Sequence, residues 1–321
     1  MKRFFTIFSL SAFVFLICGA PTITFQALTP AILDVPKHIN SIAIIDRSTL
    51  KDTKRNILEG GLTGEMPGGD KIAAEFAQNG LIDFLNDSRR FTAVRTAKTY
   101  IKNSAAESFP DPMVWNEIEK LCNEFKVDAI IALEAFDSDF IIPTNMFKVH
   151  VGFRLYDPKE KVIFDQNHFI HESVWEGRPH SVLGAINMMT DKERAIKDIS
   201  YEAGLMYGER IAPSWYTVRR EYYRKPKRDR NLREGSRMME VNNWDAAIES
   251  LGKATDSNKR KTRGRAAHNL AVVYEILGDY EQAQKWAQDA WGRYENKDSK
   301  NYSYILGQRM KEMQILKEQQ K

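Results

Sequence analysis

The glycine-rich segment Gly60–Lys71 has the residue types of a phosphate-binding loop. Gly64 and Gly69 have the spacing of a Walker motif, and an amphipathic pattern typical of a helix follows them. A nucleotide site of that kind needs a Lys followed by Ser or Thr, whereas Asp70 stands at the lysine position here. We therefore interpret the segment as a structural or partner-binding loop in which Asp70 caps the next helix. A nucleotide- or phosphate-binding hydrolase that uses Gly60–Lys71 is the alternative.

Three histidines, His168, His171 and His180, invite a metal-binding interpretation. Successive side chains of a strand point to opposite faces, so His168 and His171 cannot chelate one ion together. No Cys or acidic residue stands near them at zinc spacing. We expect surface or rim histidines, and we predict neither a metal nor a cofactor.

Cys122 could act as a nucleophile, and Asp137 and Asp139 could form an acid pair because they share one face of a strand. Cys122 falls on one helical stripe with Ile118 and Phe125, and no histidine is near it in the sequence. That pattern predicts a buried core residue. Nothing supplies a second catalytic group for the two aspartates, so we expect a solvated strand end. We predict no catalytic residue and no enzymatic activity.

A chain of 321 residues suggests two domains. The first, over residues 30–215, has the element order β-α-β-α-β-β-β-α. We expect strands at 41–45, 91–94, 127–135, 147–155 and 162–175, and helices at 70–86, 112–125 and 190–211, the last begun by a capping box at Thr190 and Glu193. This order predicts an α+β fold with a single mixed sheet and helices packed against it. The last two strands form a hairpin.

Three segments near the C-terminus repeat at a constant offset of 36 residues. Glu234-Gly235, Leu270-Ala271 and Leu306-Gly307 are equivalent pairs in the three copies. A fixed period in this range, with small residues at fixed places, predicts stacked helical hairpins. The repeat region, residues 233–318, is therefore expected to be all-α and to end in a cap helix.

The second copy resembles the tetratricopeptide repeat, with the family landmarks at Leu270, Ala271, Tyr274, Gly278, Tyr280, Ala283 and Ala290. Gly278 would end the first helix in a left-handed conformation, and Asp279 would cap the second. The match covers about a quarter of the chain, and its period exceeds the ~34 residues usual in that family.

The resemblance implies a groove lined by exposed positions of the first helix of each repeat. These partner-binding candidates are Arg233 and Ser236 in the first copy and Arg265, His268, Asn269 and Val272 in the second. The amide of Asn269 could hold an extended peptide backbone, while Arg233 and Arg265 would attract carboxylates. The alternative is a set of solvated helix faces whose contacts are only structural.

Residues 216–232 are expected to be a basic linker between the two domains. Within them, Arg219–Arg230 carries seven basic residues against two acidic ones, with Tyr222 and Tyr223 in between. Such a segment could contact the membrane through anionic lipid headgroups, or an acidic partner, or be a solvated linker. We expect no nucleic-acid partner, because the net charge is only +4 and the chain is expected to be exported.

The N-terminus has the pattern of a signal peptide over residues 1–20, with a basic pair before an apolar run from Phe4 to Ile17. The run is short for a membrane span. Three outcomes stay open: lipidation at Cys18, cleavage after Ala20, or an uncleaved anchor. We expect an exported protein in the periplasm or associated with the outer membrane, with possible membrane contact through Cys18.

The order of elements, with Gly64-Glu65 and Arg90-Phe91 around the first helix, resembles uncharacterised bacterial envelope proteins that join an αβ domain to C-terminal tetratricopeptide repeats. The αβ part is also similar in layout to the periplasmic domain of the curli-secretion lipoprotein. The resemblance implies a non-catalytic binding or scaffold protein that presents a helical-repeat surface to other envelope proteins. An oligomeric secretion or assembly accessory protein is a further alternative.

Overall fold

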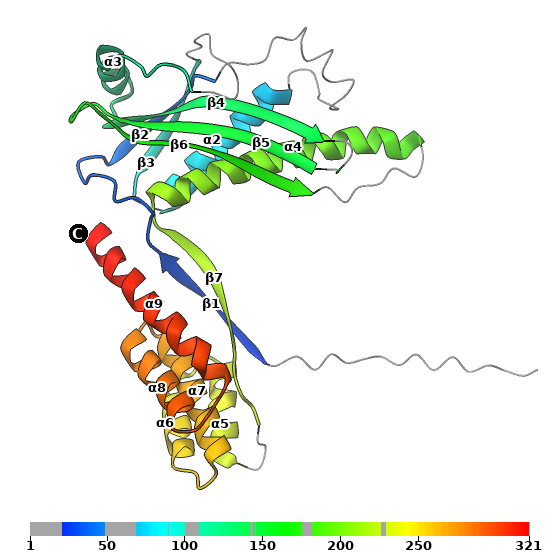
Figure 1. Ribbon diagram of the computed structural model, residues 1–321, viewed down its shortest axis with the longest axis vertical. Helices are drawn as coiled ribbons and strands as arrows, with labels where there is room; N and C mark the ends of the chain where they lie inside the picture. Colours follow the sequence, from blue (N-terminus) through cyan, green and yellow to red (C-terminus); the bar gives the residue numbers. More distant parts are fainter. Residues whose placement is uncertain are drawn as a thin grey trace, which may run out of the picture. The chain divides into compact units, whose positions relative to one another are not determined.

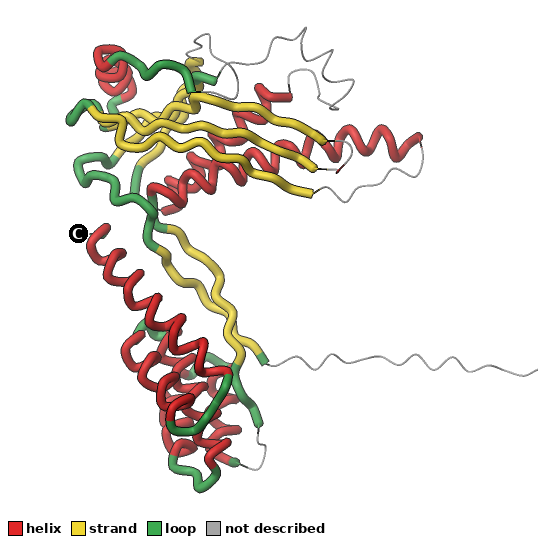
Figure 2. Tube along the Cα trace, viewed as in Figure 1, coloured by secondary structure: helices red, strands yellow, loops and turns green. Residues whose placement is uncertain are grey.

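The computed structural model describes residues 21–48, 69–88, 90–99, 109–141, 144, 146–174, 182–225 and 229–320. The chain divides into two compact units (Figures 1 and 2). One contains Leu28–Trp215 and Ile315–Lys321, and the other contains Tyr216–Gln314 and the chain up to Ala27. Each unit is described by itself.

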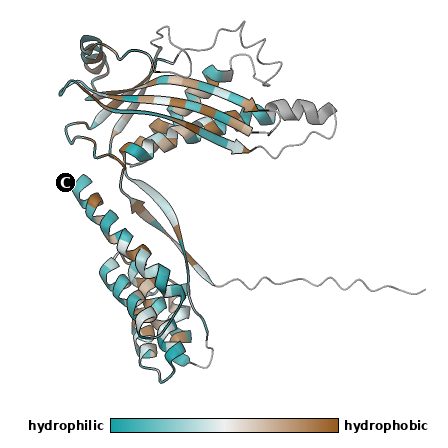
Figure 3. Cartoon of the chain, viewed as in Figure 1, coloured by the Kyte–Doolittle hydropathy of each residue, from teal (hydrophilic) through white to brown (hydrophobic). Residues whose placement is uncertain are grey.

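A five-stranded sheet with the order β3-β2-β4-β5-β6 forms the centre of the first unit. The strands are β2 (Ser41–Asp46), β3 (Thr92–Thr99), β4 (Ala129–Ile141), β5 (Met146–Asp157) and β6 (Val162–Val174). β2 pairs in parallel with β3 and β4, and β4, β5 and β6 are antiparallel. The long strands of the sheet carry both hydrophobic and hydrophilic residues along their length (Figure 3), whereas β2 is apolar from Ile42 to Ile45. The predicted mixed sheet and its terminal hairpin are confirmed.

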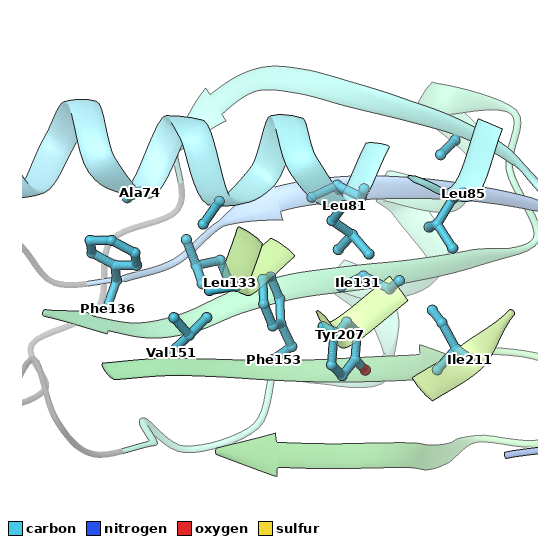
Figure 4. Packing of buried hydrophobic residues seen from close by; sticks show 14 of the residues in the cluster. Ala74, Leu81, Leu85, Ile131, Leu133, Phe136, Val151, Phe153, Tyr207 and Ile211 are labelled. Carbon is cyan, nitrogen blue, oxygen red and sulfur yellow. The ribbon is translucent and has the colours of Figure 1, made fainter. Parts of the chain in front are cut away.

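The helices α2 (Gly69–Ser88) and α4 (Val182–Ile211) supply the apolar core on one face of this sheet. Leu81 of α2, Phe153 of β5 and Tyr207 of α4 are fully buried there (Figure 4). The rings of Phe153 and Tyr207 stack with centroids 4.5 Å apart. Thr190 lies inside α4, so the helix start predicted at that residue is wrong: the helix continues N-terminally to Val182.

Two glycines let α2 and α4 cross closely. A Cβ atom added to Gly204 would lie 2.0 Å from the carbonyl oxygen of Ala77, and one added to Gly80 would lie 2.1 Å from that of Tyr201. Both distances are far below van der Waals contact, so only hydrogen fits at these positions. A third helix, α3 (Trp115–Phe125), belongs to a separate core cluster that includes Cys122 and Tyr156.

The second unit contains the helices α5 (Arg230–Glu240), α6 (Trp244–Thr255), α7 (Arg260–Ile276), α8 (Tyr280–Gly292) and much of α9 (Asp298–Gln319). Small residues predicted at the helix crossings, such as Ala247 and Ala283, are fully buried. Gly278 has a φ of +78°, and the side chain of Asp279 accepts a hydrogen bond from the backbone N–H of Gln282. The predicted all-α region and its turn are confirmed.

The strands β1 (Thr22–Thr29) and β7 (Ser214–Glu221) form a two-stranded sheet that was not predicted. A hydrogen bond of 3.0 Å joins Gln26 Nε2 to Thr217 Oγ1 across the pair. The expected linker at 216–232 is thus largely ordered structure, with Val218 only 3% exposed. Ser214 and Val218 of β7 are buried and Arg220 is half-buried, whereas the other residues of the strand are exposed. No described helix is long and apolar enough to cross a membrane.

Candidate functional site

After β7 the chain continues as an extended segment, Tyr222–Lys225, which we call the groove segment. The side-chain amide of Asn269 on α7 binds the backbone of Tyr223 at both of its polar groups. The Tyr223 N–H donates to Asn269 Oδ1 at 2.8 Å, and Asn269 Nδ2 donates to the Tyr223 carbonyl oxygen at 2.8 Å. Ser236 Oγ on α5 also donates to this carbonyl, at 2.6 Å. A single buried amide therefore binds the main chain of this segment, and these two hydrogen bonds do not depend on the side chain at that position.

The same side of α7 contacts the main chain on both sides of Tyr223. His268 Nε2 lies 3.1 Å from the carbonyl oxygen of Glu221, and Arg265 Nη1 donates to that of Lys225 at 2.9 Å. The contacts therefore fall at every second residue: 221, 223 and 225. This spacing is typical of an extended chain, in which alternate residues face the same neighbour. This side of the helical unit therefore holds a strand-like segment of the chain itself.

His268 is buried among the groups that hold this segment. Burial lowers the pKa of its imidazole, so the ring is neutral at physiological pH. Because the Glu221 carbonyl can only accept, the proton is assigned to Nε2, and Nδ1 accepts from the hydroxyl of Ser299 at 2.9 Å. Both ring nitrogens of His268 make hydrogen bonds, so neither its lone pair nor its N–H is available to a metal ion or a substrate.

The side chain of Tyr223 anchors the segment. Its ring meets His268 edge-on at 5.2 Å between centroids, and the Arg265 guanidinium lies 4.8 Å from its centre. Its hydroxyl contacts the carboxylate of Asp298 and lies 3.3 Å from Asn296 Oδ1. Burial, reinforced by the hydrogen bond to Asp298, raises the pKa of Tyr223 to about 12. The hydroxyl therefore stays protonated and donates.

A buried ion pair fixes the end of β7 beneath the groove segment. Arg220 donates from Nε and Nη2 to the two carboxylate oxygens of Glu275 at 2.8 Å each, and Tyr302 donates to Glu275 Oε2 at 2.6 Å. Glu275 is only 2% exposed. A bidentate pair with a third donor offsets much of the desolvation that burying a carboxylate costs. The sequence analysis missed it, because the partners are far apart along the chain.

The structure brings four of the six predicted groove residues together on the groove segment: Ser236, Arg265, His268 and Asn269. Arg233 is exposed, and Val272 is buried in the helical core. The exposure expected for this set is wrong for Ser236, His268, Asn269 and Val272, all of which are buried. The family pattern groups these residues on one helix face, and in the structure that face contacts a segment that lies outside the repeats. The two adjacent tyrosines after a strand were the only signal of it.

The candidate loop of the first unit is described only at its end, because Gly60 to Gly68 lie outside the described residues. Asp70 is in the first turn of α2, and its carboxylate accepts a hydrogen bond from the backbone N–H of Ser138 on β4 at 3.1 Å. It also accepts from the Ser138 hydroxyl. Asp70, which is expected to cap the helix, thus links α2 to β4 through hydrogen bonds to Ser138.

The predicted opposite orientation of His168 and His171 is confirmed. His168 contacts the rings of Phe109 and His150, whereas His171 Nε2 lies 2.9 Å from a carboxylate oxygen of Glu202 on α4. His180 lies outside the described residues. Within the described part of the chain, no group of three or more His, Cys, Asp or Glu side chains is placed to hold a metal ion.

Cys122 is a buried core residue, as predicted, in a cluster with Ile118 and Phe125. Burial raises the pKa of its thiol to about 12, so the nucleophilic thiolate does not form near neutral pH. The expectation of a solvated strand end at Asp137 and Asp139 is wrong. Asp137 is fully buried and Asp139 is half-buried, because β4 extends to Ile141 and pairs with β5 along this stretch.

A buried charged cluster on the sheet escaped the sequence analysis. Glu134 of β4 accepts from Arg47 Nη1 at 2.7 Å on each carboxylate oxygen, and the hydroxyl of Tyr156 donates to the same carboxylate. Arg47 Nη2 also donates to the carbonyl of Asp111, and the Met113 N–H donates to the Tyr156 hydroxyl, each at 3.3 Å. The cluster ties the chain before α3 to the sheet. Glu134 was hidden within an apolar run.

Fold and site together define a protein with a mixed-sheet α+β unit and a helical unit whose groove holds an extended segment. The chain belongs to the family described as Domain of unknown function (DUF8603), whose model matches residues 39–223, more than half of the chain. A second model, described as Domain of unknown function (DUF6340), matches residues 233–314. The first match ends at Tyr223, and the groove residues on α5 and α7 lie in the second.

Several solved structures are similar to the chain at a low level, including the following two. The PelC dodecamer from Paraburkholderia phytofirmans has 9% identity and a TM-score of 0.29, over 59% of this chain and 98% of that chain. Lipoprotein GNA1162 from Neisseria meningitidis has 14% identity and a TM-score of 0.19, over 49% of this chain and 98% of that chain. At these TM-scores the similarity carries no functional argument. No curated protein matches the chain.

Proposed function

We propose that the protein is a non-catalytic binding or scaffold protein of the cell envelope, and that its helical unit works as a tetratricopeptide-like module that presents a surface to other envelope proteins. The observation that supports this most directly is the pair of hydrogen bonds between the Asn269 amide and the Tyr223 backbone. An amide that pairs with both polar groups of one residue suits any extended peptide.

The groove segment is a built-in occupant of this module. It is tethered on one side by β7 and on the other by α5, so its effective concentration at the groove is on the order of millimolar. To displace the groove segment, a partner peptide would have to bind tightly enough to outcompete this effective concentration. We infer that the segment stays in place and that partners bind beside it, where Arg233 is exposed on α5. A guanidinium there favours a partner with carboxylates.

Site-specific crosslinking in the native host tests this proposal. A photoreactive amino acid is placed at position 233 or, as the control, at position 281 on α8, which the exposed Glu281 occupies. Defined protein adducts are expected from position 233 and not from position 281, and Arg233→Glu should weaken partner recovery without changing the unfolding midpoint. Equal adducts from both positions, or none from position 233, would overturn the proposal.

The envelope location rests on a lipid anchor at Cys18, which lies outside the described residues. Its support is the basic pair and apolar run that precede the cysteine. Mass spectrometry of the mature N-terminus tests it: a diacylated or triacylated Cys18 is expected. A mature chain that begins after Ala20, or an unprocessed N-terminus, would contradict the anchor.

A further inference from the structure

A pocket of about 890 Å³ lies in the helical unit beside the groove segment. Its walls come from Pro21, the end of β7, the groove segment itself, and the first turns of α9. The function proposed above makes no use of this pocket. Its lining combines positive charge with aromatic and aliphatic surface, and this combination indicates the chemistry of a ligand.

Five cationic side chains line the pocket, against the two acidic ones of Glu221 and Asp298; the cations are Arg219, Arg220, Arg224, Lys225 and Arg265. Arg220 is engaged by Glu275 and Arg224 by Glu240. Arg219 and Lys225 have no ion-pair partner among the described residues, and both are exposed. Their charges are therefore available to an anion that enters the pocket, and a planar guanidinium suits phosphate oxygens in particular.

The two acidic side chains offset only part of this charge. Arg220 and Arg224 pair with carboxylates outside the lining, which leaves Arg219, Lys225 and Arg265 against Glu221 and Asp298. The carboxylate of Asp298 also accepts a hydrogen bond from the hydroxyl of Tyr223. The apolar part of the lining includes Tyr302 and Ile305 of α9, together with Pro21. Ile305 is 38% exposed although it is a large hydrophobic residue. Cationic and apolar walls side by side suit an amphipathic anion better than a small inorganic ion.

The position of Pro21 connects this pocket to the membrane. Its carbonyl accepts a hydrogen bond from the N–H of Tyr222 at 3.0 Å, so the start of the described chain is fixed at the pocket wall. Cys18 precedes Pro21 by three residues, a stretch that spans at most about 11 Å when fully extended. A lipid on Cys18 would therefore hold the pocket within reach of the headgroup layer.

We propose that this pocket binds the phosphate group of an anionic phospholipid headgroup, with Arg219 and Lys225 as the residues that contact the phosphate. The inference deepens the proposed function, because it rests on attachment to an envelope membrane. The lipid anchor brings the protein to the bilayer, and the pocket then sets which side of the helical unit faces it. An anchor and a basic patch together supply the two signals that stable membrane attachment requires.

The test is flotation of the chain from residue 18 onward, which lacks the apolar run Phe4–Ile17 and carries Cys18→Ser, with phosphatidylcholine vesicles that do or do not contain phosphatidylglycerol. Arg219→Gln with Lys225→Gln is compared with Arg237→Gln plus Lys285→Gln, which removes the same charge from exposed positions outside the pocket lining. Binding should require phosphatidylglycerol, and the pocket pair should weaken it about 30-fold, at about 1 kcal/mol per basic residue. Equal losses from both pairs, or equal binding to both kinds of vesicle, would overturn the proposal.

Two competitors identify the source of the anion. Glycerol phosphate that releases the protein from vesicles at the concentration of the lipid itself would assign the pocket to soluble phosphate esters and overturn the lipid proposal. Polyglutamate that releases it would assign the pocket to acidic peptides, with the same consequence. The vesicle assay uses an unlipidated chain, so finding an unmodified Cys18 in the mature protein would disprove the anchor without changing the result for the pocket. Conversely, failure of the pocket test leaves the crosslinking result at position 233 unaffected.

Discussion

The amide of Asn269 and the backbone of Tyr223 are joined by two hydrogen bonds of 2.8 Å, although the residues lie 46 positions apart. Asn269 is fully buried, and Tyr223 is half-buried. The pairing satisfies an N–H and a C=O in the middle of the groove segment. It makes the groove segment an integral part of the helical unit.

Removing this amide should destabilise the helical unit. Asn269→Ala leaves the Tyr223 N–H without its acceptor and takes one donor from its carbonyl, at a cost of about 2 to 4 kcal/mol. The unfolding midpoint in urea, followed by circular dichroism, is expected to fall accordingly. Asn301→Ala, on an exposed position of α9, should leave the midpoint unchanged. If the two variants unfold alike, the segment is not held by Asn269.

The ion pair between Arg220 and Glu275 gives a second prediction. Glu275→Gln removes the charge that neutralises Arg220 and is expected to cost about 2 kcal/mol, because a half-buried guanidinium then lacks its counter-ion. Glu249→Gln is the matched control, since Glu249 also pairs with a basic residue but on an exposed helix face. Its thermal unfolding should match that of the wild type. A Glu275 variant as stable as this control would show that the pair contributes nothing.

The sheet could be predicted because its strands carry local patterns. Ile42 to Ile45 are uniformly apolar and occupy the interior strand β2, and the alternation from Phe147 to Leu155 matches β5. Pairing between β1 and β7 could not be predicted, because Gln26 and Thr217 are 191 residues apart and both strands are short and polar at many positions. A local pattern identifies a strand only when its apolar residues form a continuous run or a regular alternation.

The candidate site could be predicted in part for the same reason. The repeat register identified the face of α7 that carries Arg265, His268 and Asn269, because helical spacing alone groups these residues. What covers that face depends on the path of a distant segment. The charge of the segment around Tyr223 predicts a linker, and its one local signal, the pair of adjacent tyrosines, does not say which surface they contact. The buried Glu134 was missed likewise, since its partner Arg47 lies on a different strand end.

The close crossing of α2 and α4 gives a third prediction. Glycine-to-alanine substitution should destabilise the protein at this crossing and stabilise it at an uncrowded helix position elsewhere. Gly204→Ala places a methyl group against the Ala77 backbone, which cannot move without shifting α2, and overpacking of this kind costs about 1 to 3 kcal/mol or more. Gly252→Ala in α6 meets nothing within 4 Å and should stabilise by about 0.5 to 1 kcal/mol. Thermal unfolding of both variants checks the signs, and a neutral Gly204 variant would contradict the close crossing.

The buried imidazole of His268 links the groove segment to pH. Burial lowers its pKa below the ordinary value of 6.5, so in acid the unfolded chain binds a proton that the folded chain does not. Stability from this group is complete above pH 6.5 and falls as the pH drops below that value. Glu221 and Asp298 act in the opposite direction, since their negative charges favour the imidazolium, but desolvation is the larger effect.

We therefore expect the unfolding midpoint of the helical unit to fall between pH 6.5 and pH 5 more steeply in the wild type than in His268→Gln. Glutamine can still donate to the Glu221 carbonyl, but it does not titrate. His171→Gln serves as the control, because His171 lies in the other unit beside Glu202, on an exposed part of the sheet. Parallel midpoint curves for wild type and His268→Gln would mean that protonation of this imidazole does not oppose folding, and that the groove segment is held equally well when the ring is charged.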